Sequence, residues 1–249
     1  MNARTAPEWL TKWEYAHRGL HGEGRPENSL AAAQAAIDAG MGVECDVQRT
    51  ADGEVMVFHD WEVDWLTDGD GLVQELSADQ ITSLTLQKTD QKPPTLSAFL
   101  DCIAGRAPVL IEVKSKPGYD VEPSCARVLE TLAAYSGDVA VMSFDPRVAM
   151  WLRENAPQVT AGLVMREDRY GYTQSAAERG EALRAAAPDF LAYHVEALPN
   201  ERVAGLRAGG LPILTWTVNS PETRAVGLAN ADALVSEGEG RGADERKPT

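Results

Sequence analysis

Cysteine is scarce in this chain of 249 residues. The thiols of Cys45, Cys102 and Cys125 are odd in number and have no CxxC spacing. This argues against a disulfide framework or a zinc ribbon and fits a reducing compartment. No run approaches the ~20 apolar residues of a membrane span, and the N-terminal segment has no apolar core of signal-peptide length. We therefore expect a cytoplasmic protein without stable membrane association.

Basic residues are also few, with 23 Lys and Arg against 38 Asp and Glu and a formal net charge of −15. Such a surface repels phosphate backbones, so we expect no nucleic-acid partner, although a local basic pocket could still bind one small phosphate. Solubility alone is the other interpretation of this charge. With 44% hydrophobic and 24% charged residues, the chain is neither disordered, collagenous nor a coiled coil.

Short apolar runs alternate with helical patterns along the chain. Eight runs have strand character, at 15–19, 41–49, 108–114, 139–144, 160–165, 190–194, 213–218 and 233–236. This alternation predicts a single (β/α)₈ barrel over residues 1–249, an α/β fold. A doubly wound open sheet is the alternative, but the first strand-to-helix loop has no GxGxxG. The long irregular stretch 60–94 is predicted to be a small insertion over the barrel mouth.

Helix signals stand between the strands. Asn28-Ser29 offers a cap, Leu30, Ala33 and Ile37 form an apolar stripe, and Gly40 offers a left-handed stop. Further helices are predicted over 95–104 and after four proline-containing signals, Pro123, Asp145-Pro146, Pro199-Asn200 and Ser220-Pro221.

Carboxylates occupy strand positions that should be apolar. Glu44 and Asp46 share one face of the second strand, and Glu112 shares a face with Lys114 in the next barrel strand. A carboxylate facing a barrel interior costs several kcal/mol unless it is paired or binds a metal. Both explanations are open here: a buried salt-bridge network with Arg18 and Lys114, or an active site at the carboxyl ends of the strands.

Two histidines are placed near these carboxylates. His17 ends the first strand. A two-residue type I′ turn at Asp52-Gly53 would place Asp46 opposite His59 in a hairpin. Carboxylate oxygens suit Mg²⁺ or Ca²⁺ rather than Zn²⁺, and histidines suit proton transfer near neutral pH. Together with nearby cations that could bind phosphate, this set predicts a site that cleaves phosphoesters.

The sequence resembles the glycerophosphodiester phosphodiesterase family. Seven separate pieces agree with the family in order and spacing: His17-Arg18-Gly19, Pro26-Glu27-Asn28-Ser29, Glu44-Cys45-Asp46-Val47, Asp52-Gly53, His59-Asp60, Ile111-Glu112-Val113-Lys114 and Thr215-Trp216-Thr217-Val218-Asn219. The resemblance implies a (β/α)₈ barrel with an insertion after the second strand and its hairpin. It also implies hydrolysis of glycerophosphodiesters to sn-glycerol 3-phosphate and an alcohol, with Ca²⁺ or Mg²⁺ held by Glu44, Asp46 and Glu112.

The resemblance implies roles for five further residues. His17 and His59 match the acid/base pair, Arg18 and Lys114 match phosphate contacts, and Trp216 matches a residue that lines the glycerol side. In the family's usual reaction the glycerol 2-hydroxyl attacks phosphorus, and water then opens a cyclic phosphate. We expect His17 to be the base and His59 the acid.

Some residues depart from the family or lack a role. Ser236-Glu237-Gly238-Glu239 stands where the family has a Thr-Asp-x-Pro-like segment, which puts the last strand's contribution to the site in question. His21 and His194 are further candidates for substrate contact. Trp61 and Trp65 are candidates to shape the alcohol pocket, with packing as the equal alternative.

Two other functions are compatible with such a barrel. A lyase-type relative of phospholipase D or sphingomyelinase D would release a cyclic phosphate as its product, but such relatives need a lipid-facing apolar surface that is not evident in this sequence. A non-catalytic barrel that binds phosphometabolites would have a broken site, whereas both histidines and all three carboxylates are present.

Overall fold

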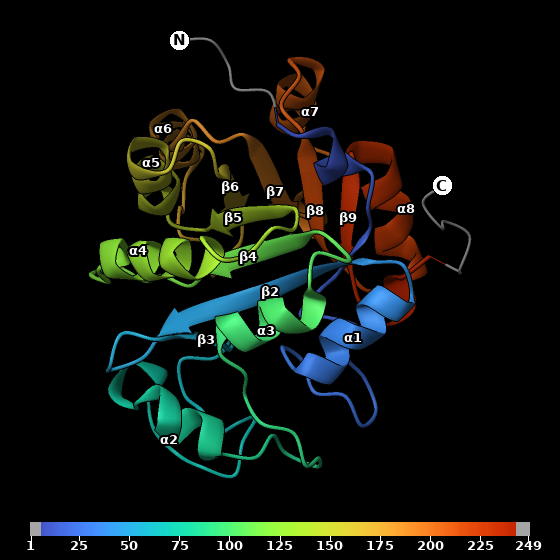
Figure 1. Ribbon diagram of the computed structural model, residues 1–249. Helices are drawn as coiled ribbons and strands as arrows, with labels where there is room; N and C mark the ends of the chain where they lie inside the picture. The colour runs from blue at the N-terminus through green and yellow to red at the C-terminus, as the bar shows by residue number, and fades with distance from the viewer. Residues whose placement is uncertain (1–5, 243–249) are drawn as a thin grey trace.

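Eight parallel strands close into a barrel in the computed structural model, which describes residues 6–242 (Figure 1). The barrel strands are β1 (Tyr15–Ala16), β2 (Gly42–Arg49), β4 (Val109–Val113), β5 (Val139–Ser143), β6 (Thr160–Met165), β7 (Phe190–His194), β8 (Ile213–Val218) and β9 (Ala233–Ser236). Pairing of β1 with both β2 and β9 closes the ring. The predicted (β/α)₈ barrel is confirmed, and the open doubly wound sheet is excluded.

A ninth strand, β3 (Val55–Val57), folds back against the end of β2, but in a different register from the one predicted. Val47 pairs with Val57, and Phe58 rather than His59 follows opposite Asp46, as the hydrogen bond from Phe58 N to Asp46 O shows. The two-residue turn is therefore wrong. Thr50 N bonds to Glu54 O, so three residues form the loop, with Gly53 at φ 86°. A three-residue hairpin loop with a left-handed glycine is a common alternative to type I′.

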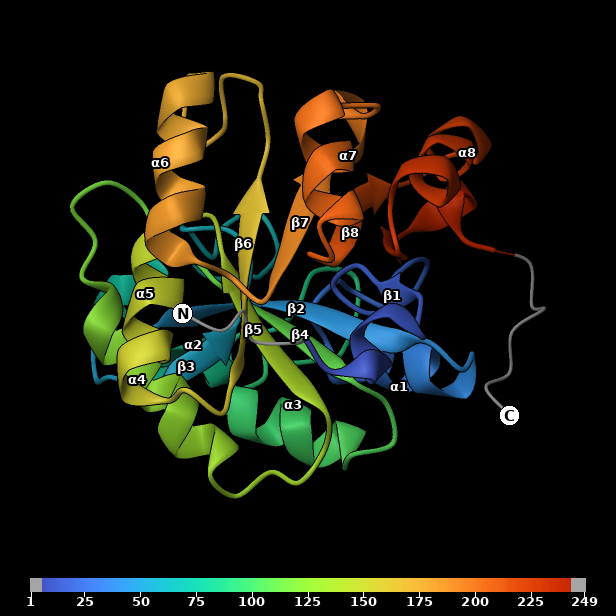
Figure 2. The same ribbon diagram turned by 90° about the horizontal axis from the view of Figure 1, so that it is seen from above.

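Helices surround the strands on the outside of the barrel (Figure 2). They are α1 (Leu30–Asp38), α2 (Ala78–Ser83), α3 (Leu96–Ile103), α4 (Val121–Leu132), α5 (Pro146–Asn155), α6 (Ala176–Ala186), α7 (Glu201–Ala208) and α8 (Pro221–Asn230), with short 3₁₀ turns η1 (Glu8–Thr11), η2 (Val73–Glu75), η3 (Val195–Ala197) and η4 (Gly238–Gly240). Capping side chains start them as expected: Ser29, Asp145 and Ser220 each accept from a backbone N–H in the first turn.

Three details of the helices differ from the sequence interpretation. Helix α6 was not predicted, although Ser175 and Glu178 form a capping box at its start. Helix α4 begins before Pro123, at Val121. Leu30, assigned to the buried stripe of α1, is 38% exposed, because Ala32, Ala33 and Ala36 form the buried face instead.

Alternate residues of each strand serve two different cores. One set fills the barrel interior, including Leu110, Met142 and Phe190, and the other packs under the helices, including Val43 and Ile111. This is the period-2 alternation of a strand applied to a closed sheet. The interior is apolar toward the amino ends of the strands, so charged side chains of the same set are confined to the carboxyl ends.

Between β3 and α3, residues 60–94 have a small core of their own, formed with residues of the β3 arm. Its buried members are Met56, Phe58, Val63, Val73, Ala78, Ile81 and Leu86. The segment lies beside the β3 arm of the hairpin, with α2 as its main helix (Figure 1).

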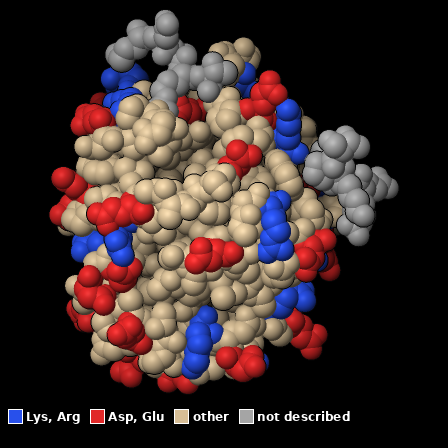
Figure 3. Space-filling model, in the orientation of Figure 1, with Lys and Arg blue, Asp and Glu red and all other residues tan. Residues whose placement is uncertain are grey.

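The surface carries no extended basic tract on the face in Figure 3, where acidic and basic side chains are interspersed. Within residues 6–242, none of the helices combines the length and apolar character needed to cross a bilayer.

Candidate active site

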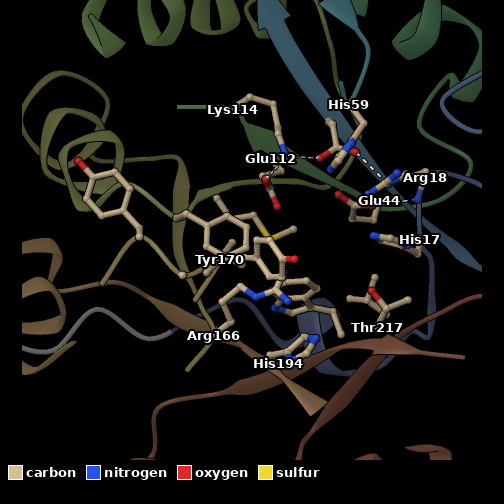
Figure 4. Close-up of a pocket in the computed structure, with 18 of the residues that line it drawn as sticks. His17, Arg18, Glu44, His59, Glu112, Lys114, Arg166, Tyr170, His194 and Thr217 are labelled. Atoms are coloured by element: carbon tan, nitrogen blue, oxygen red, sulfur yellow. Dashed lines mark hydrogen bonds and ion pairs between the residues drawn. The ribbon is translucent and has the colours of Figure 1, made fainter. Parts of the chain in front are cut away.

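A cavity of about 750 Å³ opens at the carboxyl ends of the barrel strands (Figure 4). The lining includes the eight residues to which the sequence interpretation gave a role in the site: His17, Arg18, Glu44, Asp46, His59, Glu112, Lys114 and Trp216. Residues from four barrel strands and from the hairpin arm therefore meet in one space.

Three buried carboxylates lie together in this cavity. Glu44, Asp46 and Glu112 are 2%, 3% and 7% exposed, and one oxygen from each lies within 4.8 Å of the other two. The cause is the register of two neighbouring strands, because β2 and β4 run parallel with Asp46 beside Glu112. Hence side chains on the same face of both strands point into the barrel at the same height.

The electrostatics of this carboxylate trio suit a cation. Burial, and then repulsion from Asp46 and Glu112, raise the pKa of Glu44 well above its ordinary value. Burial also acts to raise the pKa of Asp46, but Lys114, His59 and Arg18 outweigh it and lower that pKa. Three carboxylate oxygens without sulfur or imidazole are the donor set of a hard divalent cation. The trio could therefore hold a divalent metal.

Arg18 and Lys114 pair with the same carboxylates. Lys114 Nζ lies 3.1 Å from Glu112 Oε1 and 3.4 Å from Asp46 Oδ1, while Arg18 Nε lies 3.3 Å from Asp46 Oδ2. Burial opposes the charge on Lys114, but Glu112 and Asp46 outweigh it and raise its pKa. The salt-bridge network considered as an alternative is thus present, and it occupies the same cavity as the candidate metal ligands.

The backbone after β1 is specialised to deliver Arg18. Arg18 and Gly19 both have left-handed φ angles, 54° and 75°, and Arg18 N donates to Glu44 Oε2 at 2.9 Å. A Cβ on Gly19 would come within 2.8 Å of Ala32, so only glycine fits this turn without strain. The glycine of the His-Arg-Gly motif therefore has a direct structural cause.

Asn28 has a role that the sequence interpretation missed. The pair Asn28-Ser29 was predicted to cap α1, and Ser29 is the residue that does so. Asn28 instead donates from Nδ2 to Asp46 Oδ2 at 3.2 Å and accepts from Asp46 N at 3.3 Å. It is 2% exposed, so it orients the Asp46 carboxylate from beneath.

His17 is held by Glu237, another residue without an assigned role. His17 Nδ1 lies 2.7 Å from Glu237 Oε2, and His21 Nε2 lies 3.4 Å from the same oxygen. Hydrogen bonds from His17 and then His21 lower the pKa of Glu237, which is therefore an ionised acceptor. An ionised carboxylate only accepts, so Nδ1 of His17 carries the proton and Nε2 is free for the cavity. The departing Ser-Glu segment thus does contribute to the site.

His59 follows β3 and reaches the same space. Its Nδ1 lies 2.7 Å from Asp60 Oδ1. Gln48, buried in β2, donates from Nε2 to the carbonyl oxygens of Phe58, His59 and Asp60 at 3.0, 3.1 and 2.6 Å. These bonds fix the backbone of the segment that follows β3 and carries the imidazole. His59 therefore reaches the cavity although the hairpin register differs from the predicted one.

A comparison with known families decides the identity of this barrel. The family model of the Glycerophosphoryl diester phosphodiesterase family matches residues 17–237, which is most of the chain. This chain belongs to that family. The resemblance inferred from the motifs, and with it the assignment to an enzyme class, is confirmed.

Individual relatives of this family member agree over nearly the whole chain. The glycerophosphodiester phosphodiesterase of Caldanaerobacter subterraneus subsp. tengcongensis is 28% identical, over 83% of this chain and 86% of that one. The structure of the Thermotoga maritima glycerophosphodiester phosphodiesterase has a TM-score of 0.72 and 26% identity, covering 89% and 92%. An Oleispira antarctica phosphodiesterase, solved in complex with the product sn-glycerol-3-phosphate, shares the fold at 24% identity and TM-score 0.77, covering 90% and 92%.

Across the cavity from the carboxylates, this phosphodiesterase has a second wall that the sequence interpretation largely missed (Figure 4). The Arg166 guanidinium lies 5.4 Å from the ring centroid of Tyr170 and 5.6 Å from that of Trp216, and His194 packs 4.8 Å from the Trp216 ring. Burial, and then Arg166, lower the pKa of His194. The cavity therefore has one wall of carboxylates and histidines and one of aromatic rings with a cation.

Of the four residues that the sequence interpretation named as further candidates for the site, three line the cavity and one does not. His21, His194 and Trp61 line the cavity. Trp65 is 74% exposed and is absent from the lining of this cavity. Trp61 packs against Tyr119, and Lys116 Nζ lies 4.2 Å from its ring centroid. Of the two tryptophans, Trp61 is therefore the one that lines the cavity.

Proposed function

We propose that this protein hydrolyses glycerophosphodiesters to sn-glycerol 3-phosphate and an alcohol, with a divalent metal and two histidines. The observation that carries the proposal is the meeting of three buried carboxylates and two histidines in one cavity. Buried carboxylates suit a cation and histidines suit proton transfer, so this set supports metal-assisted cleavage of a phosphodiester. The Oleispira antarctica relative with bound sn-glycerol-3-phosphate supports the substrate class.

Glu44, Asp46 and Glu112 are the proposed metal ligands, and their hard oxygens favour Mg²⁺ or Ca²⁺. When bound, the metal supplies charge stabilisation at the phosphoryl oxygens and lowers the pKa of a hydroxyl bound to it. Asn28 fixes the orientation of Asp46, which keeps the ligand set in place.

The histidines divide the proton transfers between them. His17 donates from Nδ1 to Glu237, so Nε2 offers a lone pair that removes a proton from the attacking hydroxyl. His59 is assigned the opposite step, giving a proton to the leaving alcohol. The contact of its Nδ1 with Asp60 Oδ1 at 2.7 Å holds the ring in place for this step.

Arg18, Lys114 and Trp216 are proposed to bind the substrate. Arg18 Nε lies 3.3 Å from Asp46 Oδ2 in an ion pair, but among the described residues it is one of two buried side-chain nitrogen or oxygen atoms that make no hydrogen bond. Its N–H is therefore the donor we assign to a phosphate oxygen. Lys114 supplies a second positive charge at the same carboxylates. Trp216 is held by its Nε1–H bond to Ala192 O at 3.2 Å and presents its ring to the glycerol.

Phosphorus NMR tests the proposal directly. The protein is incubated with glycerophosphocholine, glycerophosphoethanolamine, glycerophosphoglycerol and a lysophospholipid, each with Mg²⁺ or Ca²⁺. We expect sn-glycerol 3-phosphate as the end product from at least one of the three glycerophosphodiesters. A cyclic phosphate that persists as the final product would make the enzyme a lyase. Binding of glycerol 3-phosphate by thermal shift without turnover of any diester would make it a binding barrel.

A further inference from the structure

Glu237 holds two histidines, and the proposed reaction uses only one of them. Both His17 Nδ1 and His21 Nε2 point at the same oxygen, Oε2, and one ligand atom from each of the three side chains lies within 4.8 Å of the others. Backbone bonds fix the group, because His17 N donates to Ser236 O and His21 N donates to Gly19 O, both at 2.9 Å. The cluster is therefore a fixed feature of the cavity wall.

The spacing of these atoms suits a small transition metal ion. Two ligand atoms that are each about 2.0–2.1 Å from a tetrahedral zinc ion lie roughly 3.3 Å apart. The separations of 2.7 and 3.4 Å between the two ring nitrogens and Glu237 Oε2 lie on either side of that value. The contact between His17 Nδ1 and Glu237 Oε2 would have to lengthen by about 0.6 Å to reach it.

The donor set differs in kind from the carboxylate trio. Two imidazole nitrogens and one carboxylate oxygen favour Zn²⁺, Ni²⁺ or Cu²⁺ over Mg²⁺ and Ca²⁺. The side chains of His17, His21 and Glu237 are 14%, 27% and 28% exposed, so an ion can enter from solution and water can complete its coordination.

We propose that His17, His21 and Glu237 form a second cation site, for a transition metal ion such as Zn²⁺, and that an ion bound there stops the reaction. The ion takes the lone pair of His17 Nδ1, so the proton on that nitrogen is released to solvent when the ring is in its Nδ1–H form. A neutral imidazole ligated through Nδ1 carries its proton on Nε2. Nε2 then has no lone pair with which to accept a proton. The inhibition rests on the proposed role of His17 as base, whereas the binding does not.

The test uses the full chain in excess Mg²⁺, which keeps the carboxylate trio occupied. Binding is measured first, without turnover, by titration with Co²⁺ and its visible absorption, and by calorimetry with Zn²⁺. Hydrolysis is then followed as ZnCl₂ is added. His21→Ala removes one ligand outside the proposed catalytic set, and His194→Ala is the matched control that removes a cavity histidine outside the cluster. Circular dichroism and thermal unfolding establish that both variants are folded.

We expect wild type and His194→Ala to bind Co²⁺ and to lose activity with Zn²⁺. His21→Ala should need at least about tenfold more Zn²⁺, since loss of even an indirect partner of a metal ligand costs about 10–100-fold in affinity. Equal zinc sensitivity of His21→Ala, relief of inhibition by more Mg²⁺, or no Co²⁺ spectrum in wild type would overturn the proposal. If Co²⁺ binds and depends on His21 but no diester is cleaved, this site stands and the proposed function fails.

Discussion

The contact between Glu237 and His17 predicts how much of the rate depends on a single charge. When His17 accepts a proton it becomes an imidazolium, and the Glu237 carboxylate 2.7 Å from Nδ1 stabilises that charge. A hydrogen bond to a charged group is worth about 1.5–3 kcal/mol and one between neutral groups about 0.5–1.5 kcal/mol. Glu237→Gln keeps an acceptor oxygen but loses the charge, a difference of about 1–1.5 kcal/mol, so kcat should fall roughly 5–13-fold.

Glu237→Ala removes the acceptor as well, so the ring loses both its orientation and its tautomer preference. Here kcat should fall further, toward the ~10²–10⁴-fold contribution of a general base. The assay compares kcat and KM on glycerophosphocholine and on a nitrophenyl diester of glycerol phosphate. Both losses should appear in kcat with KM little changed, and both should be equal on the two substrates, because a good leaving group does not replace a base. Glu239→Gln, which removes an exposed charge two residues away, is the control. Unchanged kcat in Glu237→Ala, or recovery on the nitrophenyl substrate, would refute the assigned role.

Three further predictions follow from the same structure. EDTA should abolish hydrolysis, and Glu44→Gln should weaken metal affinity and rate together, measured by calorimetry and turnover; full activity in excess chelator after dialysis would exclude the metal site. His59→Ala should bind metal nearly normally, lose turnover ~10²–10⁴-fold on the choline diester and recover on the nitrophenyl diester, and equal losses on both would exclude it as the acid. Burial acts to raise the pKa of Glu14, but hydrogen bonds from Arg224 and Ser236 lower it below 4.5, so this stabilisation is complete above about pH 4.5 and is lost as pH falls through the folded-state pKa. Glu14→Gln should therefore show a smaller acid-induced drop in unfolding temperature than wild type, and an equal drop would contradict the assignment.

Local pattern was enough to predict every barrel strand, because burial on both faces leaves an apolar run that turn and cap residues interrupt. It was less successful where several local solutions compete. The Asp52-Gly53 pair fits a two-residue turn as well as the observed three-residue loop, and the register of β3 shifted by one residue. Helix α6 has little apolar periodicity, with Ala182 and Ala186 as its buried residues, so only its capping box marks it.

The alternation of side chains along each strand, with its period of two, was fixed by the sequence alone. It identified Glu44, Asp46 and Glu112 as inward-facing. The same rule reaches His194 at the end of β7 and, one residue past β6 and β9, Arg166 and Glu237, which also line the cavity.

The order of the strands around the barrel, and the height at which each one ends, was decided only by the tertiary structure. Closure of β9 onto β1 brings Glu237 to His17 across 220 residues, and the fold of the first loop brings Asn28 to Asp46. A strand's own sequence sets which face each side chain takes, but the stagger between strands sets which side chains meet. Chemistry-bearing residue types were therefore visible in the sequence, whereas the pairing of His17 with the Glu237 carboxylate was not.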